Sequence, residues 1–228
     1  MMKASLKLLS CAILALLLSF TAIRAATIIK LDLGGVGPDL TFSGGNGGIL
    51  STIDDNPAGL TGDQATNILF TSFLSGMGST TGSYTLSGAT AVGLPTPLGG
   101  GVLTQNFNGG NFKIYNSTNT LLLDVNLAQS LLVGGGNGAF FNITNGTVVG
   151  GLPSITSQLA GNSIGMSMTL TNINNPGGPG LGLGIGGFLI PFVGDATKEI
   201  TATQTPEPSA ILLALGLFAV PMALRRRG

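Results

Sequence analysis

The amino-acid sequence predicts an all-β domain with a sandwich or jelly-roll-like architecture, flanked by an N-terminal signal helix and a C-terminal transmembrane helix. Three observations support this prediction. Apolar and polar residues alternate along the central part of the chain, Gly- and Asn-rich turns separate the alternating runs, and helical periodicity is nearly absent there. All of the 38 glycines except Gly216 and Gly228 lie between residues 26 and 204, and many short strands with Gly-rich turns favour a sandwich.

The strands are predicted from side chains that alternate with a period of two. Leu121, Leu123, Val125 and Leu127 lie on one face of such a strand, and the recurrence of apolar residues argues against a disordered segment. Similar patterns predict strands at residues 83–87, 112–115 and 166–171, with further runs at 138–142, 147–149, 186–193 and 199–203. Turn residues at 108–110 and 117–119 predict a β-meander over residues 102–127, and residues 65–74 could form one or two helical turns.

The first 25 residues have the features of a secretory signal peptide. Lys3 and Lys7 form a positively charged start, residues 8–20 are apolar, and Ala25 is a small residue at the expected cleavage position. An apolar helix over residues 8–20 would rise about 20 Å, which is too short for a stable membrane span. We therefore predict a signal peptide at 1–25 and a Gly-rich β domain at 26–204.

A second apolar segment ends the chain, in a predicted sorting region at 205–228. A Pro-Glu-Pro motif precedes the mostly apolar residues 209–224, and three arginines follow them. The defining residues are Pro206, Glu207, Pro208, Arg225, Arg226 and Arg227. As a helix, residues 209–224 would span about 24 Å, slightly less than a bilayer core of ~30 Å, and arginine side chains can reach the head groups. The arginines should remain cytoplasmic, which places residues 26–208 on the outer side of the membrane.

This ending resembles the PEP-CTERM sorting signal of Gram-negative bacteria, with Pro206, Glu207 and Pro208 on the motif positions. The resemblance covers residues 206–228, and Pro221 inside the apolar run is the one departure from it. It implies recognition by an exosortase-type processing enzyme, export across the inner membrane, transient anchoring there, and then a place at the cell surface or outside the cell. It also implies an association with exopolysaccharide or biofilm.

The composition excludes several chemistries. The chain has no His and a single Cys, so it lacks the residues for a Ser-His-Asp triad, an imidazole metal site or an intrachain disulfide. Nine basic and nine acidic side chains balance, which argues against a basic groove for nucleic acid. We therefore predict a protein that is not an enzyme and that binds no cofactor, no metal and no nucleic acid.

Some segments match functional patterns without the structural context that those patterns need. Residues 182–187 match the G-x-G-x-x-G pattern of dinucleotide-binding loops, but no βαβ unit is predicted around them. We predict instead that the alternating glycines, from Gly180 to Gly186, leave one strand face bare so that another part of the chain packs closely. Residues 116–118, 142–144 and 145–147 are glycosylation sequons, which carry little weight in a bacterial protein.

The acidic residues leave further possibilities open. Asp54, Asp55 and Asp63 could form a calcium-binding loop, because oxygen ligands suit Ca²⁺, although their spacing is not that of an EF-hand. Asp residues together with Glu199 could supply paired carboxylates for glycoside hydrolysis. The central domain has no second Glu for such a pair, and it has no Trp to stack on sugars.

Two hypotheses of function therefore remain. The first is an exported, non-catalytic cell-surface or extracellular-matrix protein that associates with exopolysaccharide through neutral hydrogen bonds from a polar surface rich in Thr, Asn and Ser. The alternative is a secreted carbohydrate- or calcium-binding module, or a glycan-active enzyme, that uses the same export route. The alternative requires acidic side chains to converge in one pocket, so the positions of Asp54, Asp55, Asp63 and Asp124 distinguish the two.

Overall fold

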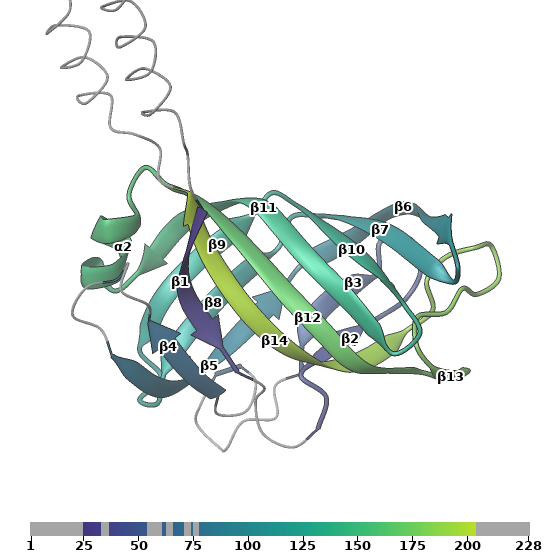
Figure 1. Cartoon of the computed structure of the whole chain (residues 1–228), viewed down its shortest axis with the longest axis horizontal. Coiled ribbons are helices and arrows are strands. Elements are labelled where there is room, and N and C mark those ends of the chain that lie inside the picture. Colours follow the sequence, from purple (N-terminus) through teal and green to yellow (C-terminus); the bar gives the residue numbers. More distant parts are fainter. Residues whose placement is uncertain are drawn as a thin grey trace, which may run out of the picture. The chain divides into compact units, whose positions relative to one another are not determined.

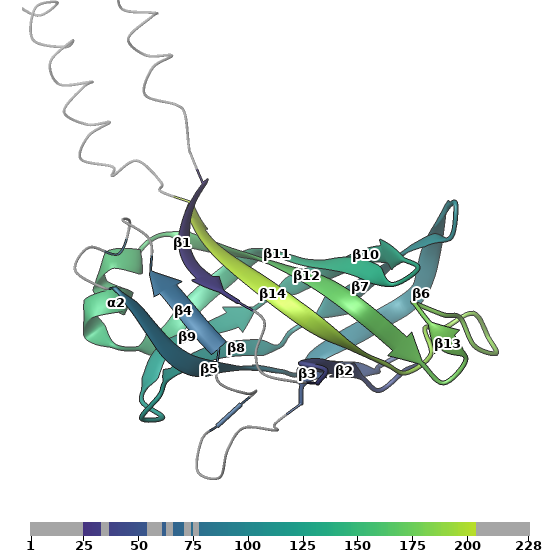
Figure 2. The ribbon, with the colours of Figure 1, turned by 60° about the horizontal axis from the view of Figure 1, so that its bottom comes forward.

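Strands make up most of the computed structural model, which describes residues 25–32, 37–53, 61–62, 66–70, 74 and 78–203 (Figures 1 and 2). The strands are β1 (Ala25–Leu31), β2 (Leu40–Phe42), β3 (Ile49–Thr52), β4 (Thr66–Phe70), β5 (Ser79–Ser87), β6 (Ala89–Gly99), β7 (Val102–Asn108), β8 (Asn111–Asn116), β9 (Leu121–Leu127), β10 (Gln129–Gly135), β11 (Gly138–Gly151), β12 (Ser163–Asn175), β13 (Gly178–Pro179) and β14 (Phe192–Thr203). A short helix, α2 (Pro153–Leu159), lies between β11 and β12 in the sequence. The all-β prediction is confirmed.

All fourteen strands belong to one sheet that closes on itself. The long strands β11, β12 and β14 run side by side across the domain (Figure 1). Toward the end that carries α2, the sheet continues from β11 through β9, β8, β5, β4 and β1 back to β14. Toward the other end, it continues from β11 through β10, β7, β6, β3 and β2 back to β14. The two walls of the sheet therefore face each other across a common apolar core.

Three pairs of strands that are consecutive in the sequence each form one continuous path that bends in the middle. One strand of each pair lies at the α2 end of the domain and the other at the opposite end. β5 and β6 meet at Gly88, β7 and β8 meet at Gly109 and Gly110, and β9 and β10 meet at Ala128. β8 pairs with β5 and β9, whereas β7 pairs with β6 and β10. The predicted meander is thus confirmed for the hairpin between β8 and β9. It is wrong at residues 108–110, where the chain bends without reversing and the two flanking strands do not pair.

Two other local predictions are also wrong. Of the predicted helical turns at 65–74, residues 66–70 form the strand β4, which alternates buried Thr66, Ile68 and Phe70 with exposed residues. Antiparallel pairing with β1 and β5 supplies backbone hydrogen bonds along both edges of β4. An isolated helix of one or two turns, by contrast, is only marginally stable. The predicted strand at 186–193 begins only at Phe192, because positive φ angles at Gly186 and Gly187 form a turn.

The predicted core faces are confirmed on β9 and β12, except that Leu121 is half-buried. Leu123, Val125 and Leu127 of β9 are buried, and so are Met166, Met168 and Leu170 of β12. A row of aromatic rings crosses the interior, with centroid separations of 5.3 Å for Phe192–Phe42, 5.7 Å for Phe42–Phe107 and 5.5 Å for Phe107–Phe141. These rings join β14, β2, β7 and β11, so side chains from both ends of the sequence form one core.

The predicted processing segments lie outside the described residues. This applies to residues 1–24 of the signal peptide and to the sorting region after residue 203, which includes the predicted transmembrane segment 209–224. Within the part of the chain that the structure describes, no helix is both long enough and apolar enough to cross a membrane.

Candidate functional site

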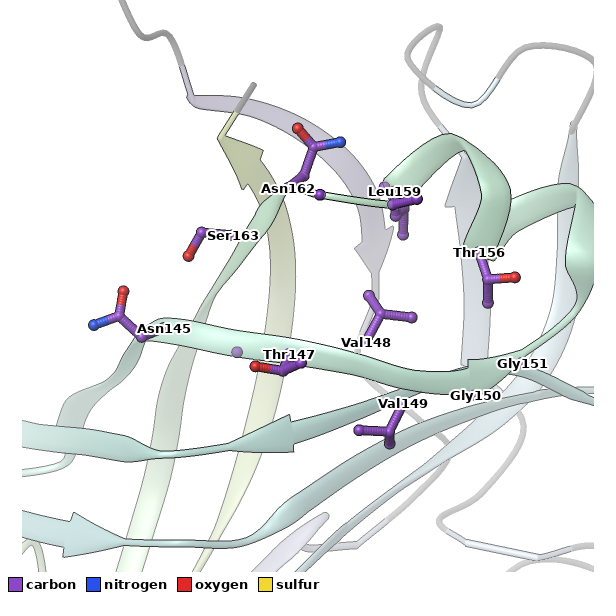
Figure 3. Close-up of a pocket in the computed structure, with 13 residues that line it drawn as sticks. Asn145, Thr147, Val148, Val149, Gly150, Gly151, Thr156, Leu159, Asn162 and Ser163 are labelled. Carbon is purple, nitrogen blue, oxygen red and sulfur yellow. The ribbon is translucent and has the colours of Figure 1, made fainter. Parts of the chain in front are cut away.

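A groove of about 610 Å³ lies between the second half of β11 and α2 (Figure 3). One side is formed by residues 145–151 of β11. The other side is formed by Thr156 and Leu159 of α2 and by residues 160–163, which lead into β12. Figure 3 shows Val148 pointing from β11 into the space below α2, whereas Val149 points away from it.

The sequence around α2 explains why a helix interrupts the strands at this point. Pro153 occupies the first helical turn, where its missing N–H costs no hydrogen bond. The N–H of Leu152 donates to the carbonyl of Leu122 at 3.0 Å, and the side chains of Ile155 and Leu159 are buried. Gly161, with a φ of 76°, then allows the chain to leave the helix and enter β12. The helix is therefore held against the end of the sheet by its apolar face.

The groove is neutral and polar. None of its thirteen lining residues carries a charged side chain. Asn145 and Thr147 are exposed and Thr156 is half-buried, and within the described residues their side chains have no hydrogen-bond partner. An amide and two hydroxyl groups can both donate and accept hydrogen bonds. This arrangement suits a ligand that presents many neutral hydroxyl groups, and the site contains no side chain that could act as an acid or base.

Two of the described carboxylates, Asp124 and Glu199, are paired with lysines at separate places. Asp124 of β9 lies 3.5 Å from Lys113 of β8 and accepts a hydrogen bond from Asn111 at 2.5 Å. Glu199 of β14 lies 3.9 Å from Lys30 of β1 and accepts a hydrogen bond from the hydroxyl of Thr27. Over the described ranges, no cluster of three or more His, Cys, Asp or Glu side chains could hold a metal ion.

The remaining predicted site residues lie outside the described residues. These are the calcium-loop candidates Asp54, Asp55 and Asp63, and all residues of the predicted sorting signal. The structure therefore places Asp124 alone among the four acidic residues that distinguish the two hypotheses. The sorting residues Pro206, Glu207, Pro208, Arg225, Arg226 and Arg227 stay predictions from the sequence.

The G-x-G-x-x-G segment is part of a packed loop. A Cβ atom on Gly182 would lie 2.9 Å from the side chain of Ile190, and one on Gly184 would lie 2.8 Å from the same side chain. The predicted close packing on bare glycines is thus confirmed. The segment is a loop with one isolated bridge between Leu183 and Leu189, not a regular strand.

Sequence reasoning did not find the groove. One signal was present, since Asn145 and Thr147 belong to a sequon that was set aside as a glycosylation pattern. The helix that forms the other wall was not predicted, because seven residues show too little periodicity to indicate a helix.

A second feature was also missed, namely that Lys198 and Asp39 are buried together in the core. Its signal was weak, because Lys198 continues the alternation of inward-facing positions through Phe192, Ala196 and Ile200 of β14.

Comparisons with protein-family models, with curated proteins and with solved structures gave no match to this chain.

Proposed function

We propose that this protein is an exported, non-catalytic component of the cell surface or extracellular matrix, and that the groove between β11 and α2 binds exopolysaccharide. The observation that carries the proposal is the neutral polar lining of the groove, with the side chains of Asn145, Thr147 and Thr156 available for hydrogen bonds. Polysaccharides present rows of hydroxyl groups, which such side chains can satisfy in both directions.

The route to the surface is proposed from the sequence. The signal peptide at 1–25 directs export across the inner membrane of a Gram-negative bacterium, and the sorting region at 205–228 anchors the protein there for a time. An exosortase-type enzyme then recognises Pro206, Glu207 and Pro208, while Arg225, Arg226 and Arg227 hold the tail on the cytoplasmic side. Processing releases the β domain to the surface or the biofilm.

The size and chemistry of the groove fit a segment of a glycan chain better than a small charged ligand. Its volume of about 610 Å³ lies within the range of ordinary ligand pockets. Because no lining side chain is charged, binding should depend on neutral hydrogen bonds and on contact with the half-buried Val148. Such binding should change little with ionic strength, since salt screens charge–charge interactions.

The test uses dextran as a neutral polysaccharide and alginate as an anionic one. Retention of the protein on each is measured for wild type and for the double variant Thr147→Val/Thr156→Val, which keeps side-chain shape and removes two hydroxyl groups. Two lost hydrogen bonds of about 1 kcal/mol each should weaken dextran binding roughly 30-fold. The control is Thr171→Val, at an exposed position of β12 outside the groove. Equal dextran binding by the double variant and by the control would contradict the proposed groove.

A further inference from the structure

A lysine and an aspartate from opposite ends of the domain's sequence are in contact inside the closed sheet. Lys198 lies on β14 and Asp39 directly precedes β2, the strand that pairs with β14 (Figure 1). The Nζ atom of Lys198 is 3.2 Å from Oδ2 of Asp39, and their side chains are 0% and 2% exposed. The pair is thus removed from water on all sides.

The surroundings hold the two groups in place. The Nζ atom of Lys198 lies 3.6 Å from the ring centroid of Tyr84, a fully buried residue of β5. The backbone N–H of Ala196 donates to Oδ2 of Asp39 at 2.6 Å. A buried charge pair costs considerable desolvation free energy, and well-packed apolar residues are often as stable in its place. Ordinary packing therefore gives little reason to find an amine and a carboxyl group in contact here.

We propose that Lys198 and Asp39 form an intramolecular amide bond, which links β14 covalently to the segment before β2. Amines and carboxylic acids condense to amides when they are held in contact and water is excluded. Proximity of this kind replaces a bimolecular encounter by a step within one molecule. The product is neutral, so the condensation also removes two charges from the interior.

The reaction balances with the atoms of the pair alone. A proton passes from the Lys198 ammonium group to Oδ1 of the Asp39 carboxylate, which leaves an amine in contact with a carboxylic acid. The lone pair of Nζ then attacks Cγ, and the N–H of Ala196 stabilises the negative charge that develops on Oδ2. Nζ passes a further proton to Oδ1, the Cγ–Oδ1 bond breaks, and one water molecule leaves. No oxidant or cofactor is required.

The other lysine–carboxylate pairs of the domain provide an internal comparison. Lys113 lies 3.5 Å from Asp124, a similar separation, but its side chain is 37% exposed. Water can then hydrate both charges, so the ion pair is stable and condensation is not favoured. We expect an amide bond at Lys198 and none at Lys113.

The positions of the basic residues make a direct experiment possible. Trypsin cleaves after Lys and Arg, and between Arg24 and Arg225 the chain contains only Lys30, Lys113 and Lys198. An amide at Lys198 blocks cleavage there and joins fragment 31–113 to the fragment that begins at residue 114. We expect mass spectrometry of the digested full-length protein, after prolonged incubation in the folded state, to find this branched species, lighter by one water than its two parts. Release of free fragment 31–113 together with cleavage at Lys198 would overturn the proposal.

Two variants test the chemistry separately from folding. Asp39→Asn should give a branched product of the same mass as wild type, because the side-chain amide loses ammonia where the carboxyl group loses water. Lys198→Arg keeps the positive charge but supplies no primary amine, so the branched product should be lost completely. If Lys198→Arg gave the branched species, another pair of residues would be responsible. If neither wild type nor Asp39→Asn gave it, Lys198 and Asp39 would form an ion pair only.

Discussion

Gly88 and Gly110 face each other at the level where two neighbouring strand paths bend. A Cβ atom on Gly88 would lie 3.6 Å from the Cα atom of Gly110, and both residues have positive φ angles, of 72° and 111°. The third bend lies beside them, because the N–H of Gly109 donates to the carbonyl of Ala128 at 3.0 Å. The three bends therefore form a line across the sheet. Each bend allows two consecutive strands to pair in different parts of the domain.

Substitution of Gly110 should destabilise the domain. In Gly110→Ala the new Cβ would lie 3.0 Å from the backbone N of Ala89, at a φ that L side chains rarely adopt. We expect a loss of about 1–3 kcal/mol in the free energy of unfolding, measured by urea denaturation. The control is Gly138→Ala on β11, where the nearest atom would be 3.6 Å away and φ is not positive. Equal urea midpoints for the two variants would contradict the need for glycine at the bend.

Phe140 and Phe141 are adjacent on β11 but face opposite sides of the sheet. Phe141 is 0% exposed and packs on Phe107, whereas Phe140 is 53% exposed. We expect Phe141→Ala to cost about 3–5 kcal/mol, as for other buried aromatic residues. Phe140→Ala should change stability by about 0.5 kcal/mol or less. Thermal unfolding of the two variants checks this, and a loss for Phe140→Ala as large as that for Phe141→Ala would mean that Phe140 does not face solvent.

Loss of the lysine in the buried pair should be costly. Lys198→Met leaves the Asp39 carboxyl group without its partner in the core, and we expect a loss of about 3–5 kcal/mol. Lys113→Met removes a lysine from a partly exposed pair and should cost about 0–1 kcal/mol. Urea denaturation of both variants measures the difference. If Lys198→Met were no more destabilising than Lys113→Met, the side chain of Lys198 would not be buried.

Processing of the C-terminus should depend on Glu207. Glu207→Ala preserves the apolar residues 209–224 and the three arginines, so membrane insertion should survive while recognition by the processing enzyme fails. We expect full-length, membrane-bound protein to accumulate, whereas wild type is shortened and released. Immunoblots of membrane and extracellular fractions measure this, with Ser209→Ala as the control variant. Equal amounts of intact, membrane-bound protein from wild type and Glu207→Ala would mean that the segment is an anchor alone.

The sequence by itself determined the all-β class and the faces of individual strands. Alternation within residues 121–127 and 166–171 correctly assigned Leu123, Val125, Met166 and Met168 to the core, because the period-two geometry of a strand is a local property. The close packing on Gly182 was also predicted correctly, since a residue without a side chain leaves room that a neighbour fills.

Only the tertiary structure decided which strands pair and what the enclosed space contains. Two glycines at 109 and 110 are compatible with a reversal or with a bend. The bend forms because β5 and β9 pair with β8 and not with β7. Residues 66–70, within the helical turns predicted at 65–74, form a strand because β1 and β5 pair with its two edges. The contact between Lys198 and Asp39 joins residues that are distant in the chain. Such contacts follow from the closure of the sheet, which no local pattern encodes.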